Sequence, residues 1–138
     1  MSGEITFRRS VDIEDEVRKA LKDYLTAYCK PLPANFQTPC ILITQVGGTN
    51  AENQIDTFDI TLDARDPDAG AANETLRNAV GILKQVAKEQ TTPLRHVEVE
   101  TSGAWGNDPA RPELSMYSAR LRVVVHTEQK TLTTQGGN

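Results

Sequence analysis

The segment from Ile55 to Gln90 constrains the fold more than any other part of the sequence. Between Thr57 and Arg65, apolar and polar residues alternate, as in a β-strand that buries one face. We expect Asp66 to cap the helix that follows, with Pro67 at its first position. The apolar residues of the strand are Phe58, Ile60, Leu62 and Ala64.

A long amphipathic helix is predicted after this strand, because apolar side chains recur at three- and four-residue spacing. Strand and helix each have one apolar face, so the simplest arrangement packs one against the other. The predicted helix stripe comprises Ala72, Leu76, Ala79, Val80, Leu83, Val86, Ala87 and Gln90.

A first helix is predicted earlier in the chain, capped by Ser10 or Asp12 and ended by Lys30-Pro31, because the residue before proline avoids helical geometry. A connector with three prolines then leads to an apolar strand over Cys40–Val46. The stripe expected for this helix is Ile13, Val17, Ala20, Leu21, Tyr24, Leu25 and Tyr28.

Two further strands are predicted over Arg95–Thr101 and Tyr117–Val125. If they form a hairpin, the carboxylates of Glu98 and Glu100 face the arginines at 120 and 122. The resulting order is αββαββ. We infer an α+β fold with a mainly antiparallel four-stranded sheet and both helices on one face.

The length of 138 residues fits one domain, which we place over residues 1–126. Residues 1–10 are weakly patterned, as in a flexible arm, and the polar residues 127–138 are expected to be disordered. The net charge of −4 argues against specific nucleic-acid binding. No apolar run approaches the ~20 residues of a membrane span. The N-terminus lacks the apolar core of a signal peptide, which favours folding in a cytoplasm.

No catalytic, metal or phosphate-binding motif is apparent, and no cofactor is expected. Cys29 and Cys40 match neither a zinc site nor a redox pair, so free thiols are predicted. Asp59 and Asp63 would lie about 13 Å apart along a strand, which favours a solvated sheet face over shared chemistry. Neither histidine, at 96 or 126, has a recognisable nucleophile nearby in sequence.

Two segments are the best candidates for contacts with partners, because long polar hairpin tips often bind them. One spans residues 47–54, and the other spans residues 103–113 and holds the only tryptophan. Trp105 is either an exposed interface anchor or a cover for the end of the core. The candidate interface residues are Gly47, Gly48, Thr49, Asn50, Glu52, Trp105, Asn107, Asp108, Arg111 and Glu113.

From about Asp12 to Thr127, the chain resembles the tail terminator proteins of long-tailed bacteriophages. The apolar strand ending in Gly47-Gly48, the alternating strand over Ile55–Arg65 and the alanine-rich helix carry the likeness. The most specific part is the segment Trp105…Asp108-Pro109…Arg111-Pro112-Glu113…Tyr117.

The resemblance implies a structural virion protein rather than an enzyme. Such a protein forms a ring, usually a hexamer, at the head-proximal end of the tail after synthesis in the bacterial cytoplasm. Its partners would be its own copies, the tail tube protein and the head–tail connector proteins. DNA would pass through the ring without specific binding.

Three alternatives remain open. The first is a head–tail joining or completion protein of the same particle. The second is a monomeric ligand-binding α+β module, which predicts a preformed apolar pocket. The third is an enzyme that uses Asp59, Asp63 and a histidine, which would have to converge within about 3–4 Å of a common point.

Overall fold

The structure, a computed structural model, describes residues 3–49 and 54–135. The helices are α1 (Ile13–Leu21) and α2 (Ala69–Glu89). The strands are β1 (Glu4–Arg9), β2 (Ala27–Cys29), β3 (Cys40–Thr49), β4 (Ile55–Asp66), β5 (Leu94–Asn107), β6 (Ser115–His126) and β7 (Glu128–Thr133).

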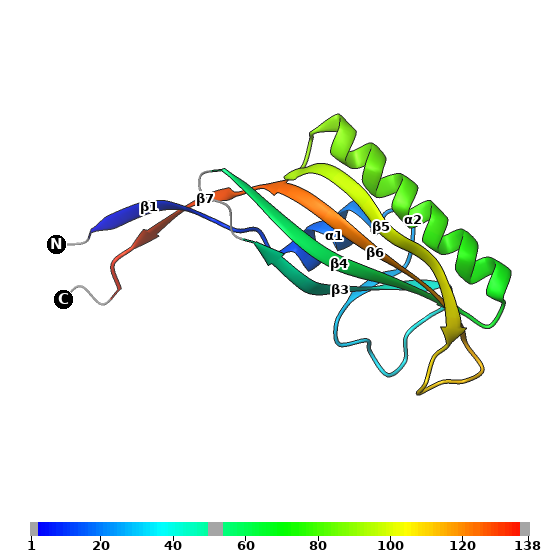
Figure 1. The fold of residues 1–138 in the computed structure, drawn as a ribbon. Helices are drawn as coiled ribbons and strands as arrows, with labels where there is room; N and C mark the ends of the chain where they lie inside the picture. Colours follow the sequence, from blue (N-terminus) through cyan, green and yellow to red (C-terminus); the bar gives the residue numbers. More distant parts are fainter. Residues whose placement is uncertain (1–2, 50–53, 136–138) are drawn as a thin grey trace.

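The main sheet has five strands in the order β2-β3-β4-β6-β5. Every neighbouring pair is antiparallel except β2 and β3, which run parallel. Both helices lie on the same side, behind the sheet in Figure 1. The mixed helix and strand content with mostly antiparallel pairing is therefore confirmed. The expectation of four strands is wrong, because β2 adds a fifth.

The core lies between the helices and the sheet, as the alternation of the central strand predicts. Phe58, Ile60, Leu62 and Ala64 are buried, and the last three have no exposed surface. Helix α1 has three buried residues and α2 has six, all of them apolar except Thr75. They are Ile13, Val17 and Leu21 from α1, and Ala72, Thr75, Leu76, Ala79, Leu83 and Ala87 from α2.

Helix α1 is shorter than its apolar spacing predicts. It begins after Asp12, whose side chain accepts a hydrogen bond from the backbone N–H of Asp15, and it ends at Leu21. The chain then turns into β2, where Ala27–Cys29 pairs with Ile41–Ile43. Tyrosine and cysteine suit a strand at least as well as a helix, and the open edge of β3 offers backbone partners. Residues Ala27–Cys29 therefore form a strand paired with β3, although their apolar spacing also fits a helix.

The start of α2 also differs from the expectation. The cap is Asp68, which accepts from the backbone N–H of Ala71 at 3.1 Å. Asp66 instead accepts from the backbone N–H of Asp68 at 2.9 Å, and it still belongs to β4. Asp66 thus forms an Asx turn before the helix, and Asp68 caps the helix itself. Pro67 lies before the helix rather than at its first position.

Residues 4–9 and 128–133 pair with each other instead of forming a loose arm and a disordered tail, and the ends of the predicted arm and tail, residues 1–2 and 136–138, lie outside the described residues. Strands β1 and β7 form an antiparallel two-stranded ribbon that extends from one end of the molecule (Figure 1). The Arg9 guanidinium contacts the Glu128 carboxylate at 2.6 Å, and Arg8 Nε donates to the Thr127 hydroxyl at 2.8 Å. Sequence patterning misses this pairing because the partners are more than a hundred residues apart.

The two cysteines are free thiols, as predicted. Cys29 is half-buried on β2, and Cys40 is fully buried at the start of β3. Burial raises the pKa of the Cys40 thiol to about 11. Since the thiolate is the reactive form, Cys40 behaves as a small apolar core residue.

Shortening Leu62 should reveal how much stability depends on the apolar face of β4. We expect Leu62→Ala to lower the free energy of unfolding by about 3 kcal/mol, because it leaves a cavity beneath α2. Thr61→Ser, on the opposite face of the same strand, should change it by less than about 0.5 kcal/mol. Urea denaturation followed by circular dichroism measures both values, and equal losses would contradict this arrangement.

Candidate interaction site

The segment predicted as a loop over residues 103–113 is strand as far as Asn107, and only the residues after it form a turn. Strand β5 continues to Asn107, and Trp105 pairs with Tyr117 of β6. Three register shifts interrupt this pairing, and Gly103 has a φ of 82° next to one of them. β-bulges tolerate such residues, so Gly103 marks an irregularity within a hairpin, whereas Gly106 pairs regularly with Met116. We call residues 105–117 the Trp105 hairpin end.

Trp105 is an exposed aromatic side chain rather than a cover for the core. Its side chain is 60% exposed, whereas Tyr117 directly opposite is half-buried against the core. Residues directly opposite in an antiparallel pair share a face of the sheet. Trp105 therefore extends the apolar face beyond the area that the core occupies.

A buried ion pair fixes the Trp105 hairpin end to the central strand. Arg65 Nε of β4 donates to Asp108 Oδ2 at 2.9 Å, and the two side chains are only 10% and 8% exposed. Strand alternation places Arg65 on the solvent-facing side, so sequence reasoning missed its burial. The adjacent hairpin end supplies the carboxylate that makes this burial tolerable.

Asp108 is also the centre of the turns that close the hairpin. Its second oxygen accepts from the Ala110 backbone N–H at 2.9 Å, and its own N–H donates to the Leu114 carbonyl at 3.1 Å. Arg111 N–H donates to the Asp108 carbonyl at 3.1 Å. Asn107 Nδ2 donates to the Pro112 carbonyl at 3.1 Å. The turn is thus held by hydrogen bonds at both of its ends.

The pKa of Asp108 follows from these contacts. Burial by itself would raise the pKa of this carboxyl. Hydrogen bonds from the Arg65 side chain and the Ala110 backbone outweigh burial and hold the pKa below its ordinary value. The charged form is therefore the one that the folded chain stabilises.

The outer part of the turn contacts the proline-rich connector. The Arg111 guanidinium carbon lies 5.4 Å from the centre of the Phe36 ring, within the range of a cation–π contact. Arg111 Nε also lies 2.8 Å from Glu113 Oε2, and this exposed pair lowers the pKa of the Glu113 carboxyl. These contacts bring together Arg111, Glu113 and a connector residue that sequence reasoning left out.

The other predicted segment lies toward the opposite end of the sheet, so the two candidate sites do not converge. Gly47, Gly48 and Thr49 belong to β3 and pair with β4, whereas Asn50 and Glu52 lie outside the described residues. A Cβ on Gly48 would come within 2.8 Å of Phe58 Cδ1 and 3.0 Å of the Thr57 carbonyl oxygen. Gly48 is therefore required by the close approach of two strands.

The polar face of the sheet carries a network of four charges. Asp59 lies 3.3 Å from Arg122 and 3.6 Å from Arg120, and Glu100 lies within 3.6 Å of both arginines. The prediction that Glu98 and Glu100 face these arginines is confirmed, because Glu100 contacts both and Glu98 lies directly opposite Arg122 in the register of β5 and β6. Because the arginines are about half exposed, each pair contributes little to stability.

The residues considered for catalysis have separate partners. Asp63 accepts from the Ser118 hydroxyl at 2.6 Å, and Asp59 contacts arginines. His126 contacts Gln54 and Arg8, whereas His96 lies beside α2. Within residues 3–49 and 54–135, no group of three His, Cys, Asp or Glu side chains is placed to hold a metal ion.

No protein-family model matches the chain, and no curated protein matches it. None of the helices in the described part of the chain is long and apolar enough to cross a membrane.

Replacing Asp108 with asparagine should cost stability in a pH-dependent way. The folded-state pKa is below the ordinary value of about 3.9, so the carboxylate stabilises the fold fully above that value and loses its effect as pH falls through the folded-state pKa. We expect Asp108→Asn to lower the free energy of unfolding by about 1–3 kcal/mol at pH 7.

The difference between the wild type and Asp108→Asn should shrink below about pH 4, as measured by chemical denaturation across pH. Glu113→Gln removes a carboxylate from an exposed pair and should leave the free energy of unfolding at pH 7 essentially unchanged. A difference for Asp108→Asn that stays constant down to pH 2 would be inconsistent with the ion pair.

The two adjacent glycines of β3 should respond oppositely to alanine. Gly48→Ala should lower the free energy of unfolding by about 1–3 kcal/mol, because its Cβ meets backbone as well as a ring. The nearest atom to a Cβ on Gly47 is Asp59 Oδ2 at 3.5 Å, an ordinary contact. Gly47→Ala should therefore be neutral or slightly stabilising. Thermal unfolding of both variants checks this, and an equal loss would refute the explanation.

Proposed function

We propose that this chain is a tail terminator of a long-tailed bacteriophage. Copies form a ring that caps the tail tube, ends its polymerisation and joins it to the head connector. The observation that carries the proposal is the exposed Trp105 on a hairpin end that a buried ion pair fixes to the central strand. This hairpin end is also the segment in which the sequence most resembles that family.

An ordered hairpin end suits an interface because binding then costs less conformational entropy. Large aromatic side chains dominate protein interfaces, but their contribution is reduced when binding must first order a loop. The backbone around Trp105 is already ordered by its pairing with Tyr117 and by the Arg65–Asp108 pair. Such a preformed apolar surface suits a contact that must be repeated identically in every copy of a ring.

We assign the Trp105 hairpin end to the contact with the tail tube. In Figure 1 the turn that closes this hairpin projects at one end, opposite the β1–β7 ribbon. A ring with one tip of each copy against the tube would stop further addition of tube subunits. The other end would then be available to the connector proteins.

Trp105→Ala should weaken tube capping while leaving the monomer folded. Because the side chain is 60% exposed, we expect the free energy of unfolding to change by less than about 1 kcal/mol. Affinity for tube ends should fall at least about tenfold, since aromatic anchors carry at least ~2 kcal/mol of binding energy. Tube length in negative-stain images measures capping.

Tyr24→Ala provides a matched control, because Tyr24 is 70% exposed and lies outside the Trp105 hairpin end. It should leave capping unchanged. Sedimentation of the wild type with and without tube protein tests the proposal itself. A protein that stays monomeric in both cases would favour the ligand-binding module. A ring that binds connector proteins but never tube ends would favour the joining protein.

A further inference from the structure

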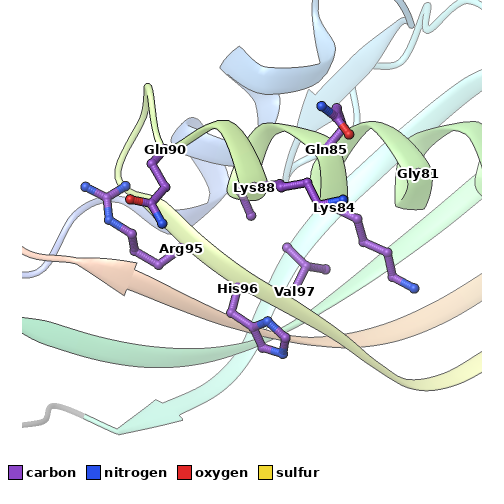
Figure 2. Close-up of a pocket in the computed structure, with 9 residues that line it drawn as sticks. Gly81, Lys84, Gln85, Lys88, Gln90, Arg95, His96 and Val97 are labelled. Carbon is purple, nitrogen blue, oxygen red and sulfur yellow. The ribbon is translucent and has the colours of Figure 1, made fainter.

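A cationic groove lies between α2 and the edge strand β5. Its volume is about 640 Å³, and its lining includes Lys84, Lys88, Arg95 and His96 but no acidic residue. Figure 2 shows these side chains along the helix and the start of the strand. The whole chain carries a net charge of −4, so this groove is a local exception on an acidic protein.

The cations of the groove are not neutralised within the described chain. Among residues 3–49 and 54–135, no ion pair includes Lys84, Lys88 or Arg95. Arg95 donates to the backbone carbonyls of Thr92 and Leu94, which leaves its charge uncompensated. Lys88 also benefits from the dipole at the C-terminal end of α2, but Lys84 lies a turn earlier, where that effect has decayed.

Gly81 is a second and independent sign that this groove accepts a partner. Glycine is the poorest helix former after proline, and Gly81 lies in the middle of a 21-residue helix. A Cβ at this position would meet no atom within 4 Å, so packing inside the described chain does not require glycine. A bare backbone in a groove wall allows another chain to approach closely.

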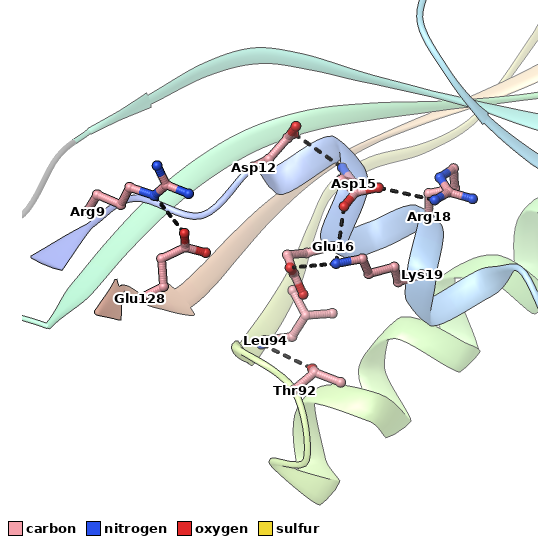
Figure 3. Close-up of polar contacts among 9 residues, drawn as sticks. All are labelled: Arg9, Asp12, Asp15, Glu16, Arg18, Lys19, Thr92, Leu94 and Glu128. Carbon is pink, nitrogen blue, oxygen red and sulfur yellow. Dashed lines mark hydrogen bonds and ion pairs between the residues drawn. The ribbon is translucent and has the colours of Figure 1, made fainter. Parts of the chain in front are cut away.

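A complementary acidic surface exists on α1. Its first turn carries Glu14, Asp15 and Glu16, and Asp12 precedes it as the cap. Figure 3 shows Asp15 shared between Arg18 and Lys19, and Glu16 against Lys19. Arg9, Lys130 and Glu128 line the same surface, so five carboxylates lie among four cations there and the surface keeps a single net negative charge.

We propose that the groove between α2 and β5 binds the acidic first turn of α1 from a neighbouring copy, with Lys84 and Lys88 facing the partner's Asp15 and Glu16. The inference rests on the proposed ring and supplies its lateral contact. The groove and the acidic turn are different surfaces of one copy, so the contact is head-to-tail. Such contacts close into rings when the rotation between copies permits.

Charge reversal with rescue tests this contact. The Lys84→Glu/Lys88→Glu variant should lose ring formation, and so should Asp15→Lys/Glu16→Lys. An equimolar mixture should regain rings, because each altered surface then meets a complementary one on the other variant. Recovery in the mixture cannot arise if either variant is misfolded. Native mass spectrometry measures the ring population, and rings that need more than about tenfold higher protein concentration count as lost.

Glycine substitutions separate helix stability from docking. Gly81→Ala and Gly70→Ala both place a better helix former in α2 at positions with room for a Cβ, so both should raise the melting temperature. Docking should respond only to a side chain at position 81, which lines the groove, and a larger side chain there should block it. Gly81→Leu should reduce ring formation at least about tenfold, whereas Gly70→Ala should leave it unchanged.

The outcomes distinguish this contact from the proposed function. If the wild type forms no rings even with tube protein, the proposed function fails and the contact fails with it. If rings persist unchanged in Lys84→Glu/Lys88→Glu and in Gly81→Leu, the contact alone is refuted. Binding of a duplex DNA fragment that the lysine variant loses, with its rings intact, would overturn the contact in favour of a nucleic-acid surface.

Discussion

The structure depends on the one-sided burial of its central strand. Strand β4 has β3 and β6 as hydrogen-bonded neighbours, and its alternate residues Phe58, Ile60 and Leu62 form the middle of the core. Two helices cover that face, so the opposite face must tolerate water. The charged residues on the open face satisfy one another in pairs that contribute little to stability. Stability is thus concentrated on one side of the sheet.

The buried Arg65–Asp108 pair has a different role. Replacing buried ion pairs with apolar residues is often neutral or stabilising in other proteins, so stability alone is a weak reason for such a pair. Here both partners also determine geometry, because Asp108 organises the turn while Arg65 belongs to the central strand. The pair therefore fixes the position of the hairpin that carries Trp105 relative to the core.

The sequence predicts the elements that follow from local periodicity, but it predicts few of the features that depend on pairing between distant segments. The alternation of β4 and the apolar stripe of α2 suffice to identify the core, because each follows from a period of two or 3.6 residues. The end of α1 is mispredicted because Tyr24 and Tyr28 fit a helical stripe, while the backbone partners of β2 lie beyond the proline connector.

The candidate site is harder to predict for the same reason. Trp105 is identifiable from its residue type, but its support by Arg65 requires knowledge that the turn after β5 contacts the end of β4. The ribbon formed by β1 and β7 has no local signal at all, because neither strand buries a regular apolar face. The sequence alone identifies Gly81 as an isolated glycine within a helix. The structure adds that a Cβ there would meet no atom within 4 Å, so close packing inside the described chain does not explain the glycine, whereas docking of a partner would.

The two proposed surfaces differ in chemistry, and the difference has consequences for assembly. The groove contact depends on exposed charges, which salt screens over distances of about 8–10 Å at physiological ionic strength. The Trp105 contact depends on apolar burial, which salt does not weaken in this way. In the proposed assembly, high salt should therefore separate copies from one another before it separates the hairpin ends from the tube. In the proposed ring, lateral contacts would form only when oppositely charged surfaces are aligned, and each copy would bind the tube through an apolar anchor that is already ordered.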